Sequence, residues 1–240
     1  MILLTAMFHL SKWYLDCVTE EGRVFVAYTA RLQWHALSLD YTTVLGGASS
    51  LKPCPPPECS GDAIEWCAPE IGVEGTWLAL EAPVRETLYD ADGRVEWNCF
   101  QPRGWAQVRV GGERLRGLGY VERLDMTVPA WRLPIEELHW GRLLTAAGSV
   151  VWIDWRGSHS KQLVLRNGVA AEPELLTRLE LDRGLVLRDG SLGKTALSII
   201  PKVERLFPWR ILRVRETKWR SRGLLYGVSG WAIHEVVRWP

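Results

Sequence analysis

The chain has 240 residues, of which 47% are hydrophobic and 24% charged, and its formal net charge is +1. This composition is typical of a soluble globular protein and excludes a disordered chain, and the small net charge provides no general attraction to nucleic acid or to a membrane. Tryptophan is unusually frequent, with 14 copies, and many of these side chains must be partly buried because each brings a large apolar surface.

The N-terminal segment MILLTAMFHLSKWYLD has a short apolar run but no preceding basic residues and no small-residue cleavage site, so we do not expect a signal peptide. The sequence has no run of about 20 apolar residues, and therefore no transmembrane segment is expected. The five cysteines are odd in number and irregularly spaced, which favours a reduced, cytoplasmic protein over a disulfide framework.

Short segments rich in β-branched and aromatic residues alternate with glycine-containing turns along the whole chain. This pattern predicts an antiparallel β protein with roughly 12 to 18 short strands, too many for one flat sheet. The best helical candidate is Glu172–Leu181. The clearest strand candidates are Arg23–Ala30, Arg94–Phe100, Trp105–Val110, Ser149–Trp155, Gln162–Arg166 and Leu224–Ser229.

Two proline-containing stretches indicate internal boundaries. Lys52–Cys59 holds four prolines, which cannot donate to a strand ladder, so we expect a surface loop there. Val128–Pro134 lies near the midpoint and is expected to link two β halves. The sequence therefore predicts an N-terminal half at residues 1–128 and a C-terminal half at residues 129–240.

The stretch Arg116–Asp125, RGLGYVERLD, begins like a dinucleotide-binding loop but places Glu122 where that loop needs its last glycine. A carboxylate there would repel a pyrophosphate, so we interpret the glycines as positions where a strand bends. Gly190–Thr195 imitates a phosphate-binding loop, but Arg188 occupies the position of its first glycine. No cofactor and no metal are expected, since the spacing of the cysteines matches no common zinc module.

Carboxylates beside aromatic residues are the remaining chemical signal. Residues two apart in a strand share a face, so Tyr120 lies beside Glu122, and Trp152 lies beside Asp154. If both faces point inward, two acids lie in an aromatic-lined cavity. A low dielectric raises the pKa of a carboxyl group, and an aromatic face stabilises a cation by about 0.5–2 kcal/mol. Such a site suits the addition of water to an alkene or the cyclisation of a polyene.

Structural alternatives exist for these charged residues. Glu122 precedes Arg123 and Asp154 precedes Arg156, so each acid could instead form an ion pair at the end of a strand. The basic segment Lys202–Arg222 is either a solvated strand edge that resists aggregation or a site for an anionic partner.

Four short motifs resemble the carotenoid 1,2-hydratase and AttH-like group, which is similar in fold to tocopherol cyclase-like and other lipocalin-like proteins. They are Trp97–Pro102, Arg116–Glu122, Trp140–Gly141 and Val151–Asp154. The resemblance implies an all-β fold of two consecutive lipocalin-like antiparallel β-barrels or strongly curved sheets packed together, with a hydrophobic ligand cavity. It also implies that Glu122 occupies the acidic position of the family. Family members often place a tryptophan–glycine pair soon after this acid, whereas here that pair follows much later.

The leading hypothesis is a cofactor-independent lyase or isomerase, a hydratase or cyclase, that acts on a small hydrophobic substrate of isoprenoid or polyketide type. Its expected acid is Glu122 or Asp154, oriented by Tyr120, and the expected cavity wall is Trp97, Trp140 and Trp152. The alternatives are a pericyclase of the Diels–Alderase type that uses cavity shape, and a non-catalytic lipocalin-like binder of an apolar ligand. Binding of single-stranded nucleic acid through Arg205–Arg222, with Trp209 and Trp219 as stacking platforms, is not favoured.

Overall fold

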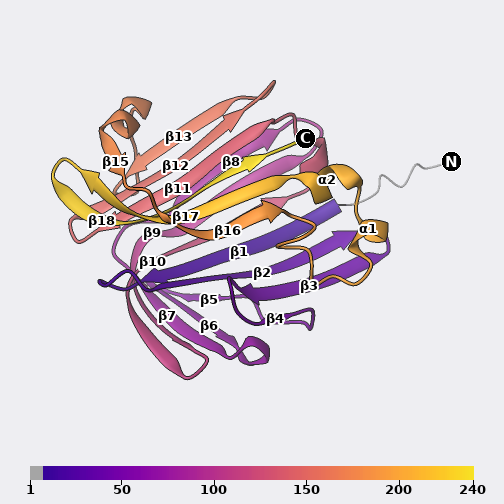
Figure 1. The fold of residues 1–240 in the computed structure, drawn as a ribbon, viewed down its shortest axis with the longest axis horizontal. Helices are drawn as coiled ribbons and strands as arrows, with labels where there is room; N and C mark the ends of the chain where they lie inside the picture. The colour runs from indigo at the N-terminus through magenta and orange to yellow at the C-terminus, as the bar shows by residue number, and fades with distance from the viewer. Residues whose placement is uncertain (1–7) are drawn as a thin grey trace. The chain divides into compact units, whose positions relative to one another are not determined.

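The computed structural model describes residues 8–240 and is mainly β-strand (Figure 1). The chain divides into two compact units. The first comprises the described residues up to Thr19 together with Phe25–Leu133, and the second comprises Glu20–Val24 and Pro134–Pro240. Each unit holds one antiparallel sheet, which confirms the expected all-β fold class. The division into halves at residues 1–128 and 129–240 stays a prediction.

Residues 1–7, which form part of the segment used to argue against a signal peptide, lie outside the described residues. Among residues 8–240, no helix is both long and apolar enough to cross a bilayer.

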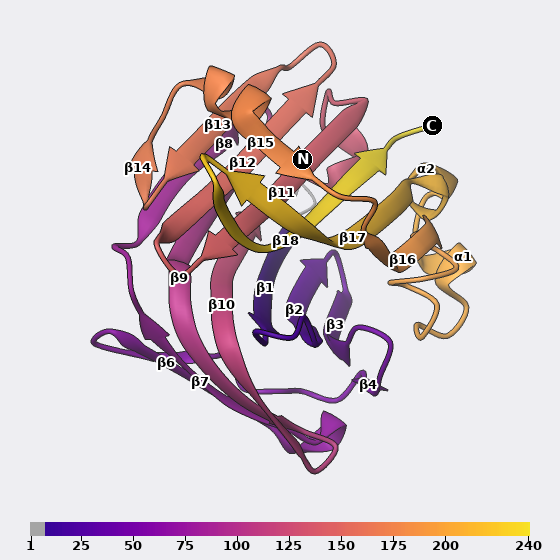
Figure 2. The ribbon, with the colours of Figure 1, turned by 60° about the vertical axis from the view of Figure 1, so that its left-hand side comes forward.

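The sheet of the first unit has ten strands. They are β1 (Phe8–Val18), β2 (Val24–Trp34), β3 (Leu37–Val44), β4 (Ser49–Ser50), β5 (Glu58–Ser60), β6 (Ala63–Ala68), β7 (Val73–Ala79), β8 (Val84–Asp90), β9 (Arg94–Val110) and β10 (Glu113–Met126). Their order is β4-β3-β2-β1-β10-β9-β7-β6-β5, with β8 paired to β9. The long strands β9 and β10 are visibly curved in Figure 2. Two 3-10 turns, Pro69–Ile71 and Ala130–Arg132, complete the unit.

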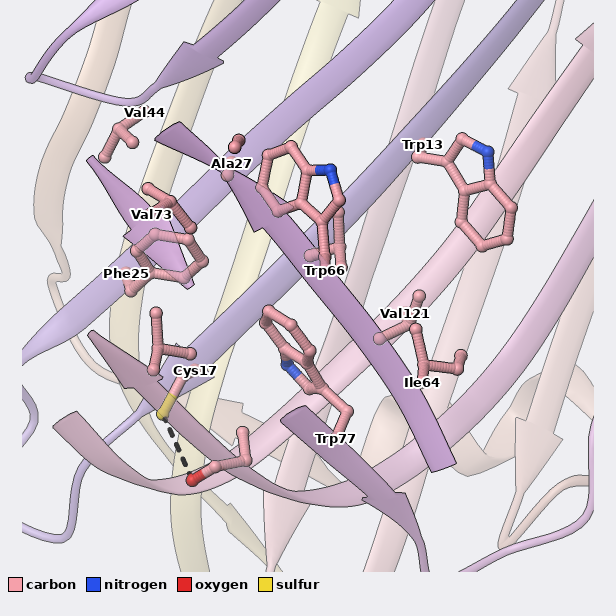
Figure 3. Close-up of a cluster of buried hydrophobic side chains, with 14 of the residues drawn as sticks. Trp13, Cys17, Phe25, Ala27, Val44, Ile64, Trp66, Val73, Trp77 and Val121 are labelled. Carbon is pink, nitrogen blue, oxygen red and sulfur yellow. Dashed lines mark hydrogen bonds between the residues drawn. The ribbon is translucent and has the colours of Figure 1, made fainter. Parts of the chain in front are cut away.

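One face of this sheet carries the hydrophobic core of the first unit (Figure 3). Alternation along β1 sends Trp13, Leu15 and Cys17 into this core, so the residues between them point to the opposite face. Trp77 is fully buried in the core, and its indole N–H donates to the Asp16 carbonyl at 2.7 Å. Burial of each large side chain contributes about 1.5–3 kcal/mol to stability, so this face supports the fold while the other face is available for polar groups.

The glycines of RGLGYVERLD lie where β10 meets its neighbours most closely. The register between β10 and β9 shifts on either side of Val121, which is the irregularity that lets a strand bend. A Cβ atom at Gly119 would lie 2.5 Å from the Asp16 carbonyl oxygen, and one at Gly117 would lie 2.0 Å from the Val18 carbonyl oxygen. These glycines therefore permit both the bend of β10 and the close approach of the β1 backbone. The bend agrees with our interpretation of the glycines from the sequence.

Replacing Gly117 by alanine should lower the free energy of unfolding by about 1–3 kcal/mol, because the added methyl group collides with strand backbone that cannot rotate away. Urea denaturation followed by circular dichroism measures the change. The matched control is Gly47→Ala, where the added Cβ would lie 3.3 Å from the Val44 side chain, and there we expect a change below about 1 kcal/mol. Equal midpoints for wild type and Gly117→Ala would contradict the close-approach explanation.

The sheet of the second unit has eight strands. They are β11 (Glu137–Thr145), β12 (Gly148–Arg156), β13 (Lys161–Arg166), β14 (Val169–Ala170), β15 (Leu179–Leu181), β16 (Leu185–Ser191), β17 (Arg215–Leu225) and β18 (Val228–Arg238). Their order is β14-β13-β12-β11-β18-β17-β15, with β16 paired to β17. A 3-10 turn at Pro173–Arg178 packs against one face, and the short helices α1 (Val203–Leu206) and α2 (Trp209–Arg213) join β16 to β17.

Three local expectations were wrong. The segments 94–100 and 105–110 form the single strand β9, because Gly104 stays extended and pairs with Gly119 and Ala79. The expected helix Glu172–Leu181 is a 3-10 turn followed by β15, which pairs with β17. The expected strand Leu224–Ser229 contains the turn between β17 and β18, where both Tyr226 and Gly227 have positive φ.

Candidate active site

Three of the predicted site residues meet on one face of the sheet in the first unit. Tyr120 and Glu122 lie two apart on β10, and Cys99 of β9 pairs with Glu122, which places Trp97 on the same face. The Tyr120 hydroxyl donates to Glu122 Oε2 at 2.6 Å, and the Trp97 indole N–H donates to the same oxygen. Both donors are held by buried side chains, so one oxygen of the Glu122 carboxyl group is fixed in position.

A second tyrosine–acid pair lies beside the first on β1. In the antiparallel register, Tyr14 is opposite Glu122 and Asp16 is opposite Tyr120. The Tyr14 hydroxyl donates to Asp16 Oδ2 at 2.9 Å, and both residues are buried. Two tyrosine–x–acid motifs are thus arranged head to tail on neighbouring strands. The repeated spacing, Tyr14-Leu-Asp16 and Tyr120-Val-Glu122, is the sequence signal that could have revealed this second pair.

Aromatic rings surround the two acids. The Tyr14 ring lies edge-on to the Tyr120 ring, with centroids 5.9 Å apart, and edge-on to the Tyr28 ring, with centroids 5.4 Å apart. All three tyrosines are buried. Glu122 is less buried than its partners, so its carboxyl group lies where the cluster approaches the accessible surface.

The buried phenol and thiol of this cluster are held in their neutral forms. Burial raises the pKa of Tyr120 well above its ordinary value, and the negative charges of Cys99 and Glu122 would raise it further. Burial likewise raises the pKa of the Cys99 thiol, although a hydrogen bond with Tyr120 opposes this effect. Tyr120 therefore remains a hydrogen-bond donor at neutral pH. An indole N–H only donates, so Glu122 Oε2 accepts from two donors of fixed protonation.

The predicted residues of the second unit are arranged differently. Asp154 lies on β12 and accepts from Arg156, with contacts of 2.9 Å to Nε and 2.7 Å to Nη2, which is the ion pair considered as its structural alternative. Trp152 packs in the hydrophobic core of this unit, and its ring covers Gly141. Since Gly141 pairs with Trp152, the neighbouring Trp140 points to the opposite face of the sheet. Trp140 and Trp152 therefore do not line the same surface.

Sequence reasoning missed a buried charge network on the Trp140 face of the second unit. The Lys218 ammonium group lies 5.0 Å from the centre of the Trp140 ring and forms an ion pair with Glu235. Glu216 accepts from Arg188 Nε at 3.0 Å and lies 4.0 Å from Lys218. Burial and the nearby Glu235 raise the pKa of Glu216, while the two cations oppose the shift. Since no local spacing marks residues from β16, β17 and β18 as neighbours, the network becomes visible only in the folded sheet.

His234 lies on the other face of this sheet. Its ring stacks on Trp219 with centroids 5.2 Å apart, and its Nε2 lies 2.9 Å from the Ser221 hydroxyl oxygen. Burial lowers the pKa of His234 to about 4, and the positive charge of Lys218 adds to this effect. His234 is thus neutral in the folded protein at neutral pH.

This lowered pKa predicts a loss of stability in mild acid. The unfolded chain binds a proton at His234 near its ordinary pKa of about 6.5, whereas the folded chain binds it only near 4, so stability falls as the pH drops from about 6.5 to about 4. The full contribution is about 3 kcal/mol, since each pKa unit corresponds to about 1.4 kcal/mol. Denaturation midpoints at several pH values should fall less steeply for His234→Gln, and a ring titration near pH 6.5 in the folded protein would contradict the prediction.

A small pocket in the second unit contains none of the predicted site residues. Its lining includes Leu143, Val150, Leu225 and Arg166, and the Arg166 guanidinium group lies over the ring of Tyr226, which also lines the pocket. Among residues 8–240, no three histidine, cysteine, aspartate or glutamate side chains gather in a way that could hold a metal ion. The five cysteines all carry free thiols.

No family model and no curated protein matches this sequence. Solved structures do match it. The crystal structure of CghA has a TM-score of 0.51 at 10% identity, and the match covers 96% of this chain and 88% of CghA. A candidate AttH from Nitrosomonas europaea has a TM-score of 0.46 at 8% identity, with 96% and 92% covered. Kievitone hydratase from Nectria haematococca has a TM-score of 0.45 at 12% identity, with 97% and 89% covered. The chain thus shares its fold with CghA along almost its whole length.

Proposed function

We propose that this protein is a cofactor-independent enzyme that hydrates or cyclises a hydrophobic substrate of isoprenoid or polyketide type, with Glu122 as the general acid. The observation that supports this proposal is the double donation of Tyr120 and Trp97 to Glu122 Oε2 within a cluster of buried aromatic rings. Because Oε2 accepts both hydrogen bonds, the proton of the neutral acid resides on Oε1. The two donors therefore act as positioning residues that fix the direction of proton transfer.

The reaction begins when Glu122 transfers this proton to one carbon of a substrate double bond. A C–H bond forms, the π bond breaks, and positive charge develops on the other carbon. Addition of water to that carbon, followed by loss of a proton to the Glu122 carboxylate, completes hydration. Attack by a second double bond of the same substrate, followed by loss of a proton to the Glu122 carboxylate, completes cyclisation. Both routes return Glu122 to its protonated form.

The surroundings of Glu122 suit a cationic intermediate. The Tyr14 ring lies within 6 Å of both the Tyr28 ring and the Tyr120 ring, and an aromatic face stabilises a nearby cation by about 0.5–2 kcal/mol. Asp16 supplies a second carboxyl group on the same face and is positioned to stabilise the cation.

Asp154 is the weaker candidate for the acid. Its carboxyl group accepts two contacts from Arg156, and the full positive charge of a guanidinium group favours the charged form, which has no proton to donate, more strongly than the two neutral donors to Glu122 do. We therefore assign the acid role to Glu122 alone and regard Asp154 as a structural partner of Arg156.

The test is incubation of the purified protein with a panel of isoprenoid and polyketide alkenes, followed by mass spectrometry. Hydration adds one water to the mass, and cyclisation gives an isomer of unchanged mass with a new retention time. Tryptophan fluorescence measures uptake of each compound independently. If every compound that binds is recovered unchanged, the protein is a binder of apolar ligands and the enzyme proposal is wrong.

A further inference from the structure

The segment that joins β16 to β17 in the second unit presents a basic surface with an exposed tryptophan. It contains α1 and α2, which lie next to each other in both views of the ribbon (Figures 1 and 2). Phe207, Ile211 and Val214 are buried and anchor the segment. Because these three residues supply the apolar contacts, the outward residues are free to serve another purpose.

Trp209 is the most exposed tryptophan of the chain, with 62% of its surface accessible. The Arg213 guanidinium group lies 5.2 Å from the centre of its ring, so a cation and an indole are presented together. Glu204 is the one acidic residue between positions 202 and 215. The exposed basic residues of the same segment are Lys202, Arg205, Arg210, Arg213 and Arg215.

The remaining basic residues of Lys202–Arg222 contact other side chains of the second unit. Lys218 is buried in the charge network, and the guanidinium groups of Arg220 and Arg222 both lie over the Trp231 ring, at 4.7 and 4.8 Å. Most of the exposed basic residues of this segment therefore lie at positions 202–215, and Arg222 is the exposed basic residue outside that range. We call residues 202–215 the basic helical surface.

We propose that the basic helical surface binds the surface of an anionic lipid bilayer. Basic side chains are attracted to anionic headgroups, and tryptophan is favoured at the boundary between headgroups and acyl chains. Single-stranded nucleic acid is less well matched, because binding it requires several stacking platforms and the Trp219 ring is already stacked on His234. If the proposed function holds, this contact places the enzyme where a hydrophobic substrate accumulates.

Co-sedimentation with vesicles tests this proposal without any substrate. The full chain should bind vesicles of phosphatidylcholine and phosphatidylserine in a molar ratio of about 7:3, bind pure phosphatidylcholine much less, and be released by salt. The double variant Arg210→Ala/Arg213→Ala should weaken binding by about 30-fold, which corresponds to about 1 kcal/mol for each arginine. Trp209→Ala should also weaken binding and should abolish the quenching of tryptophan fluorescence by brominated acyl chains.

Matched controls lie in the first unit. Trp105 is also about half exposed, and Arg114 and Arg116 are exposed on β10, so Trp105→Ala and Arg114→Ala/Arg116→Ala remove the same groups elsewhere. These controls should bind as wild type does. Equal losses in the controls, or equal binding to neutral vesicles, would overturn the proposal, as would a single-stranded oligonucleotide that binds tighter than the vesicles. Glu122→Gln should bind vesicles normally, so failure of the catalytic proposal is distinguishable from failure of this one.

Discussion

Replacing Glu122 by glutamine is expected to lower turnover by about 10²–10⁴-fold, with little change in substrate binding. Glutamine has nearly the shape of glutamic acid, and its amide oxygen can still accept from Trp97 and Tyr120. It has no acidic proton to transfer, so the variant separates proton donation from the architecture of the site. Steady-state kinetics measures kcat and KM, and fluorescence titration measures ligand affinity.

Two further variants make this prediction specific. Asp154→Asn should retain turnover, because Asp154 is the partner of Arg156. Tyr120→Phe removes one of the two donors to Oε2 but leaves the acid, so we expect a smaller fall in kcat and a shift of the alkaline limb of the pH–rate profile, where a general acid loses its proton, to higher pH. A purely structural role of Tyr120 would lower stability without moving that limb.

The opposite result has a definite meaning. A pericyclic reaction that depends on the folded conformation of the substrate needs no proton transfer, so Glu122→Gln would then lose little activity. Full activity in both Glu122→Gln and Asp154→Asn would exclude acid catalysis. It would favour the shape-driven alternative, in which Glu122 at most polarises a carbonyl group of the substrate.

The part of the site that the sequence could predict is local. The two-residue spacing of Tyr120 and Glu122 places them on one face in any strand, and the structure joins them by a hydrogen bond. Tyr14 and Asp16 have the same spacing, but their place beside Glu122 depends on the pairing of β1 with β10 across about 100 residues of chain. Strand pairing over such a distance is not encoded in any local pattern, and a slip of one residue reverses the faces.

The errors in the fold have related causes. Gly104 looks like a turn signal in the sequence, yet it lies inside β9, because neighbouring strands on both sides supply its hydrogen bonds. Trp140 and Trp152 were both expected in one cavity wall because both are large and aromatic. Their faces follow from the register of β11 with β12, in which Gly141 and not Trp140 is opposite Trp152. Tertiary pairing decides both cases.

Replacing Lys218 by methionine should produce the largest loss of stability, about 3–5 kcal/mol in the free energy of unfolding. Lys218 is only 1% exposed, and it is the cation that faces Glu235 and lies near Glu216. Methionine keeps the length and the apolar contact with Trp140 but leaves Glu235 without this buried partner. Removing one member of a buried ion pair costs more than the pair contributes, because the remaining charge stays desolvated. Denaturation midpoints measure the loss.

The double variant Lys218→Met/Glu235→Gln separates the cost of an unbalanced charge from the loss of packing. Removing both charges should restore part of the stability, since no buried ion is then left uncompensated by this pair. Arg238→Met is the matched control in the same sheet, because Arg238 forms an exposed ion pair with Glu137 at 3.2 Å, and its loss should cost less than about 1 kcal/mol. If Lys218→Met costs no more than Arg238→Met, the network is solvated and its charges do not constrain the fold. If the double variant is less stable than Lys218→Met, the lysine stabilises mainly through Glu216 and Trp140, and Glu235 contributes independently.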